Sequence, residues 1–173
     1  LADLTNRQHH LTFINPYFDA VKLLNYDRNN YENVLVFSSA LPNSLPNFPA
    51  AQEFIDFVSN GGSLFIAPDN GQLSSIFRQV GETFGVVYFP SSASLIDTAQ
   101  PESSFIRTPR LQNTAGAILG EESVDLKPLI FLGTPMTSVD NVPYVKRVVA
   151  ATQTTIVMDN NKILAQGRAI SLL

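Results

Sequence analysis

The chain has 173 residues, a formal net charge of -4 and no cysteine. Because 45% of its residues are hydrophobic and only 15% are charged, its composition is that of a folded domain with a buried core. The acidic balance, with Lys146-Arg147 as the sole adjacent basic pair, argues against a nucleic-acid surface, and the lack of cysteine excludes disulfides, thiolate metal sites and a cysteine nucleophile.

Short apolar segments alternate with turn signals before Phe48. They predict, in chain order, the end of an amphipathic helix at residues 1–8, a strand at 11–14, a short helix at 17–25 and a strand at 34–37. The last of these is a continuous apolar run, which is typical of a strand buried on both faces.

A clear α/β unit follows between Phe48 and Phe89. Apolar residues at positions 51, 54, 55 and 58 have the spacing of one helical face, and Gly61-Gly62 stops this helix. Residues 64–67 then predict a buried strand, residues 73–84 a second amphipathic helix and residues 86–89 another strand. Because helices alternate with short apolar strands, we expect a Rossmann-like (flavodoxin-like) α/β fold, with a largely parallel sheet and helices on both faces.

The composition changes after Pro90, where Ser, Thr, Pro and Gln become frequent. Short strands are predicted at residues 94–97, 117–119, 129–132, 154–158 and 162–166, with Asp159-Asn160-Asn161 as the turn of a hairpin. We therefore divide the chain into a Rossmann-like α/β part, residues 1–90, and a β-rich continuation of the same domain, residues 91–173.

Polar residues at the carboxyl ends of the predicted strands are the first candidates for a site, because open parallel sheets bind ligands there. They are Ser38-Ser39, Asp69-Asn70-Gly71 and Pro90-Ser91. Ser38 and Ser39 lack the flanking glycines of a nucleophile elbow, and the two histidines of the chain, His9 and His10, are adjacent to each other. Asp69 is explained more simply as part of a turn that starts the next helix than as a phosphoacceptor or metal ligand.

Two other motifs also lack the context that chemistry would need. Gly61-Gly62 ends a helix and precedes a strand, whereas phosphate-binding glycines follow a strand and open a helix. Glu121, Glu122 and Asp125 form the densest acidic group, but their spacing is not that of metal ligands, so we expect them to be solvated. We therefore predict no catalytic residue, no cofactor-binding residue and no metal site.

Several stretches of the chain, taken in order, carry a resemblance to a known family. They are LTF, YENVLVFSSAL, FIDFVSNGGSLFIAPDNG, IFRQVGETFGVVYF and LKPLIFLGTPMTSVDNVPYVKRVVAATQTTIVMDNNKI. Together they resemble the family of the 48 kDa subunit of oligosaccharyltransferase (dolichyl-diphosphooligosaccharide–protein glycosyltransferase) over nearly the whole chain. The helix–Gly-Gly–strand piece is shared by several Rossmann-like families, whereas the stretch over residues 126–163 is much more specific.

The resemblance implies a non-catalytic accessory subunit of the complex that transfers a preassembled oligosaccharide from dolichyl diphosphate to asparagine in Asn-x-Ser/Thr. It implies that the catalytic site lies in a different subunit and that the partners are the other subunits of this complex. The chain starts at Leu1 and not at Met, and we interpret it as a lumenal fragment of an endoplasmic-reticulum membrane protein whose anchor lies outside it.

Two other hypotheses stay open. A relative with the same Rossmann-like domain serves in another assembly, of the intraflagellar-transport or gliding-motility type, and would share residues 48–89 but not the pattern over residues 126–163. Alternatively, the chain is a small-molecule or sugar-binding domain that uses the strand ends near Ser38 and Asp69.

Overall fold

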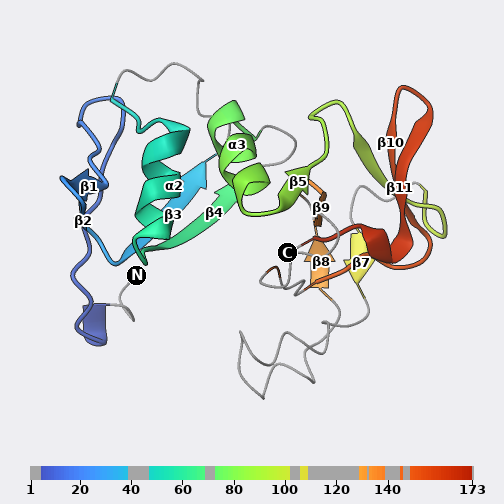
Figure 1. Ribbon diagram of the computed structural model, residues 1–173. Coiled ribbons are helices and arrows are strands. Elements are labelled where there is room, and N and C mark those ends of the chain that lie inside the picture. Colours follow the sequence, from blue (N-terminus) through green and yellow to red (C-terminus); the bar gives the residue numbers. More distant parts are fainter. Residues whose placement is uncertain are drawn as a thin grey trace.

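The computed structural model describes residues 5–38, 47–68, 73–101, 106–108, 129–131, 133–138, 145 and 149–172 (Figure 1). Over these residues the fold is mixed α/β, with few helices and several small sheets. Two hydrophobic cores divide it into an α/β lobe, which ends at Gly85, and a β lobe, which begins at Phe89. Strand β5 (Val86–Tyr88) joins the two lobes.

The N-terminal segment folds differently from the prediction. Residues 11–14 have no regular secondary structure, because no described strand pairs with them. The helix predicted at residues 17–25 is also wrong: a turn at 16–18 leads through irregular chain to a hairpin of β1 (Leu24–Asn25) and β2 (Arg28–Asn29). The side chain of Asn15 accepts a hydrogen bond from the backbone N–H of Tyr17 at 3.1 Å, and such local bonds compete with a helix. Of the helix predicted at 1–8, residues 1–4 lie outside the described residues, and residues 5–8 form one helical turn.

The βαβ unit predicted after residue 33 is confirmed. It consists of β3 (Asn33–Ser38), α2 (Ala51–Ser59) and β4 (Ser63–Pro68), and the two strands pair in parallel. Gly61 follows α2 in the left-handed conformation, with a φ of 88°, as a helix-ending glycine should. At Gly62 packing requires a glycine, because a Cβ there would collide with the ring of Phe57.

The first core lies between the two helices and one face of β3 and β4. Helix α3 (Ser75–Thr83) carries the predicted stripe and ends before Gly85, whose φ is 82°. On α2 the stripe is rotated from the prediction, since Phe57 is fully buried whereas Ile55 and Val58 are half-buried. The buried residues of this core are Leu23, Ala51, Phe54, Phe57, Leu73, Phe77 and Val80.

The parallel sheet is smaller than predicted. Among the described strands, β3 and β4 form the one parallel pair, and β5 pairs antiparallel with β9 (Met136–Ser138) instead of extending their sheet. Strand β5 leads out of the α/β lobe, and the next residue, Phe89, is buried in the β lobe.

Helices do not cover both faces of β3 and β4 in the described part of the chain. Both helices pack against the face that carries Val34, Val36, Leu64 and Ile66. On the opposite face, Leu35 is 51%, Phe37 72% and Phe65 47% exposed, so the prediction that residues 34–37 are buried on both sides is wrong. A continuous apolar run has the same sequence pattern whether one or both faces are covered.

The β lobe confirms most of the predicted strands. The confirmed strands are β6 (Ser94–Asp97), β8 (Leu129–Phe131), β10 (Thr155–Asp159) and β11 (Lys162–Gln166). Two further elements of this lobe were not predicted: strand β7 (Ile106–Thr108) and a 3-10 helix, η3 (Gly167–Ala169). The strand predicted at residues 117–119 lies outside the described residues. The hairpin turn is confirmed, because Asn160 and Asn161 both have positive φ, as a tight turn between β10 and β11 needs.

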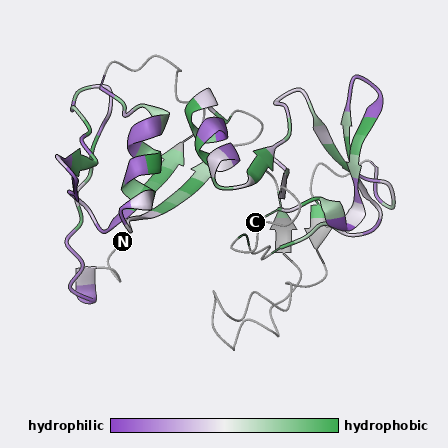
Figure 2. Ribbon diagram, viewed as in Figure 1, coloured by the Kyte–Doolittle hydropathy of each residue, from purple (hydrophilic) through white to green (hydrophobic). Residues whose placement is uncertain are grey.

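The β lobe has a core of its own. Strands β11, β10 and β6 form an antiparallel sheet in that order, and β7 pairs with β8. The buried residues are Phe89, Ile106, Val149, Ala151, Val157, Ile170 and Leu172. In Figure 2 apolar residues occur in the strands of both lobes. No helix in the described ranges is long and apolar enough to cross a membrane.

Candidate interaction site

Of the residues predicted at strand ends, those that the structure describes are not brought together as a site. Ser38 is the last residue of β3, whereas Ser39 and Asp69-Asn70-Gly71 lie outside the described residues. Pro90 and Ser91 are exposed beyond β5, and since β5 is not in the sheet of β3 and β4, the prediction that they share an edge with Ser38 is wrong.

Of the other predicted polar groups, the structure describes His9 and His10. His9 and His10 are exposed in a segment without regular structure. Glu121, Glu122, Asp125 and Lys146-Arg147 lie outside the described residues. Within the part of the chain that the structure describes, no three His, Asp or Glu side chains are placed to hold a metal ion.

The described residues form a groove of about 410 Å³ along one edge of β3, a feature that the sequence did not reveal. Strand β4 pairs with the other edge, and no described strand pairs with this one. Residues 33–37 of β3 all line the groove. Because consecutive residues of a strand point to opposite faces, a groove lined by all five follows the strand edge and its backbone N–H and C=O groups.

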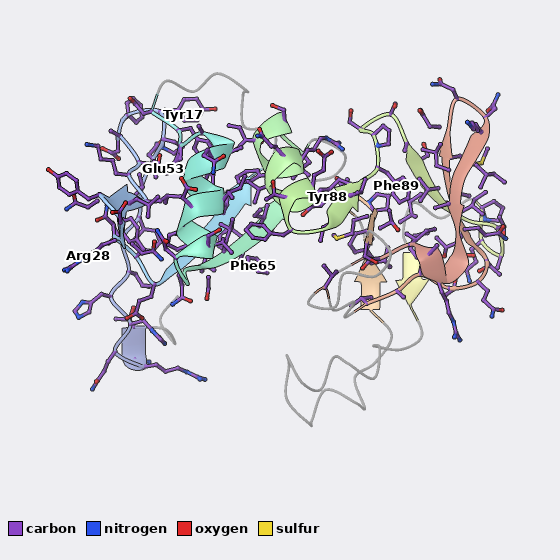
Figure 3. The ribbon with its side chains drawn as sticks, in the orientation of Figure 1. Tyr17, Arg28, Glu53, Phe65, Tyr88 and Phe89 are labelled. Carbon is purple, nitrogen blue, oxygen red and sulfur yellow. The ribbon has the colours of Figure 1, made fainter. Side chains whose placement is uncertain are left out.

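The N-terminal segment forms the opposite wall of this groove. Thr12, Ile14 and Pro16 line it as alternate residues, which is the pattern of an extended chain. Hydrogen bonds hold the following residues to the α/β lobe: the backbone N–H of Leu23 donates to Glu53 Oε1 at 2.7 Å, and that of Val21 donates to the Asn47 carbonyl at 3.1 Å. Figure 3 shows Glu53 on α2 and Tyr17 above it.

The described residues that line the groove carry no charge. Besides residues 12, 14, 16 and 33–37 they are aromatic and aliphatic: Tyr17, Val21, Leu23, Tyr31, Phe48 and Phe54. Free edges in natural sheets usually carry a charge, a proline or a bulge that prevents pairing with another strand. β3 has no charged residue and no proline, and its register with β4 is regular. The groove is therefore suited to an uncharged, extended guest and not to acid–base chemistry.

Beside the groove lies an uncovered apolar surface, which we call the outer face: Leu35, Phe37 and Phe65. The rings of Phe37 and Phe65 contact each other across the two strands, with centroids 6.0 Å apart and planes inclined by 54°. Figure 3 shows Phe65 on the side of β4 away from α2. Exposed aromatic clusters of this kind are typical of protein–protein contacts.

Polar side chains of the β lobe form hydrogen bonds that connect its strands. The Thr154 hydroxyl donates to Asp97 Oδ1 at 2.6 Å, and the backbone N–H of Ala99 donates to the same oxygen at 3.1 Å. These bonds join the end of β6 to the start of β10, so the buried Asp97 has a structural role.

One comparison with known proteins identifies a relationship over almost the full length. The model of a protein family described as OST48, N-terminal domain, matches residues 1–172. No curated protein matches the chain.

Proposed function

Because the chain belongs to the OST48 N-terminal domain family, which is the family of an oligosaccharyltransferase subunit, we propose that it acts as a non-catalytic accessory subunit of that complex. In this role it supports the en bloc transfer of oligosaccharide from dolichyl diphosphate to asparagine in Asn-x-Ser/Thr, while the catalytic site lies in another subunit. We place it on the lumenal side of the endoplasmic-reticulum membrane, with an anchor outside these residues. The family match does not support the intraflagellar-transport or gliding-motility hypothesis.

The outer face is the observation that carries this proposal. A subunit without chemistry of its own contributes through its contacts, and the cores of such contacts are enriched in aromatic residues. Phe37 and Phe65 form an aromatic pair on a face that the described helices leave open. We propose that another subunit of the complex packs on this face.

We also propose that β3, α2 and β4 belong to a Rossmann-like, largely parallel sheet, within a single lumenal domain that comprises residues 1–90 and their β-rich continuation, residues 91–173. The groove supports this view, because its two walls are a free strand edge and an extended segment whose sequence predicts a strand at residues 11–14. One further uncharged strand in the groove pairs with both walls. This pairing supplies hydrogen-bond partners for the N–H and C=O groups of β3 that face the groove.

Amide hydrogen exchange tests the sheet directly. The N–H groups of alternate residues in β3 point toward β4 or toward the groove. We expect the groove-facing amides to exchange fast in the 173-residue chain and slowly in the complete subunit, since hydrogen-bonded strands are protected. Fast exchange of these amides in both forms contradicts the larger sheet.

Depletion and reconstitution test the function. We expect the isolated, complete subunit to transfer no oligosaccharide from a dolichyl diphosphate donor to an Asn-x-Thr peptide. We expect its depletion from cells to lower the occupancy of glycosylation sites in a reporter protein, and its re-expression to restore that occupancy. Transfer by the isolated subunit, or full occupancy after depletion, contradicts the proposal.

A further inference from the structure

The two hydrophobic cores meet at two adjacent residues. Tyr88, the last residue of β5, packs against the core of the α/β lobe, and Phe89 is buried in the core of the β lobe. Among the core residues, the chain passes from one lobe to the other once, at this point. Figure 3 shows Tyr88 beside α3 and Phe89 on the side of the β lobe. We call Tyr88 and Phe89 the junction.

Helix α3 holds the junction through Arg78. Its guanidinium nitrogen Nη1 donates to the carbonyl oxygens of Tyr88 at 3.2 Å and of Phe89 at 2.9 Å. Both bonds are charge-assisted and partly buried, which makes them stronger than bonds between neutral groups in water. One side chain of the α/β lobe therefore binds the peptide group that joins Tyr88 to Phe89 and the peptide group that follows it.

The same helix also holds the ring of Tyr88. Gly81 lies one turn after Arg78, and a Cβ at that position would come within 2.6 Å of Tyr88 Cε2. The ring thus rests against bare helix backbone. Burial raises the pKa of the Tyr88 hydroxyl, and the positive charge of Arg78 partly opposes this shift.

Backbone hydrogen bonds continue from the junction into the β lobe. The N–H of Phe89 donates to the Pro135 carbonyl at 3.1 Å, next to the ladder between β5 and β9. Met136 and Ser171 exchange two bonds, of 3.0 and 2.7 Å. The neighbours of Ser171, Ile170 and Leu172, are buried in the β-lobe core. A continuous set of contacts therefore leads from α3 to the centre of the β lobe.

We propose that Arg78 is a positioning residue that fixes the orientation of the β lobe relative to the α/β lobe. Lobes joined by a single crossing are expected to move relative to each other unless contacts hold them. With Arg78 bonded to both carbonyls, the α/β lobe and the β lobe form one rigid body. This inference does not depend on the proposed function.

Distance measurements between the lobes test the proposal. Because the chain has no cysteine, one can be introduced in each lobe at the exposed positions Ser59 and Gln166, and spin labels on the pair report the spread of distances. We expect a narrow distribution for the parent chain and a broad one for Arg78→Met. The matched control is Gln79→Met, at an exposed position on the same helix, which should leave the distribution narrow.

Exchange at the Phe89 amide supplies a second readout. In Arg78→Met it should become faster by roughly 10- to 100-fold, the effect of losing bonds to a charged donor. Amides in the centre of β10 should not change, which separates loosening of the junction from unfolding of the lobe.

Two outcomes would overturn the proposal: an Arg78→Met distribution as narrow as that of the parent, or equal broadening in Gln79→Met. If Arg78→Met does not fold, Arg78→Gln keeps a polar amide but loses the charge and the length that reach the two carbonyls. The proposal then predicts broadening with both cores intact, and a parent-like distribution would contradict it.

Discussion

Each lobe has a core of seven buried apolar residues among those described, but the lobes differ in what they leave uncovered. In the β lobe, antiparallel strands surround side chains such as Val157, Ile170 and Leu172. In the α/β lobe, two helices cover one face of a two-stranded sheet, and the other face and one edge stay open. All the large hydrophobic side chains that are exposed in the described residues precede Phe89, except Ile163 and Leu164.

This difference indicates which of the described surfaces is suited to bind a partner. Each Å² of apolar surface removed from water contributes about 25 cal/mol. Burying the uncovered aromatic face in an interface would therefore contribute substantially to the free energy of binding. Among the described residues of the β lobe, the exposed large hydrophobic side chains are Ile163 and Leu164. We therefore expect substitutions in the cores to act on stability within one lobe, and substitutions on the outer face to act on assembly.

The largest effect is expected for Phe57→Ala. Phe57 is fully buried under Gly62, and the cavity left by its ring should lower the free energy of unfolding of the α/β lobe by about 3–5 kcal/mol. Urea denaturation with hydrogen exchange resolves this lobe from the other, and β10 should stay protected. Phe18→Ala, at an exposed position, is the control and should change stability by less than about 0.5 kcal/mol. Equal losses from both lobes would show that the cores are not separate.

Ile170→Ala makes the reciprocal change. Ile170 is fully buried in the β lobe, and its truncation should cost about 2–5 kcal/mol there. In the same exchange experiment the amides of α2 should keep their protection. The exposed Ile163→Ala serves as control. Loss of protection in α2 would show that the two lobes do not unfold independently.

The glycine pair after α2 separates steric crowding from backbone strain. Gly62→Ala should lower stability by about 1–3 kcal/mol, because the new methyl group meets the Phe57 ring. Gly61→Ala has free space around it and should cost only about 1 kcal/mol, from its positive φ. Thermal unfolding gives the order of the two. A larger loss for Gly61→Ala would contradict the packing described for Phe57.

The smallest effect concerns the pH dependence of the junction. The unfolded chain loses the Tyr88 proton at a pKa of about 10, whereas burial raises this pKa in the folded protein. Above about pH 10 the folded state therefore binds more protons than the unfolded state, and stability should fall as pH rises. Tyr88→Phe should weaken this dependence, measured by urea denaturation between pH 8 and 11, while Tyr26→Phe, at an exposed position, should not.

Local structure was predictable from the sequence where a local pattern determines it. The helical spacing over residues 51–58 and 73–84, the glycines that follow them and the Asn160-Asn161 turn all predicted the elements observed. The rotated stripe on α2 had a signal as well, since Phe57 lies three residues after Phe54 and so shares its helical face.

Pairing between distant segments was not predictable in the same way. The apolar run of β5 is compatible with either a parallel or an antiparallel strand. Its partner, β9, lies some fifty residues later in the sequence. The groove depends on which edge of β3 stays free and on where residues 12–16 lie. The outer face was missed because a sequence does not state which face of an apolar strand is covered.

Assembly with the outer face altered is the most direct test of the central claim. In the complete subunit, Phe37→Ser with Phe65→Ser removes the aromatic pair, and Ile163→Ser with Leu164→Ser removes exposed apolar side chains of the β lobe as a matched control. We predict that the first variant folds but co-purifies with at most roughly one tenth of the other oligosaccharyltransferase subunits, given the weight of aromatic residues in interfaces. The control should retain them. Full recovery of the complex with the Phe37 and Phe65 variant would contradict the account.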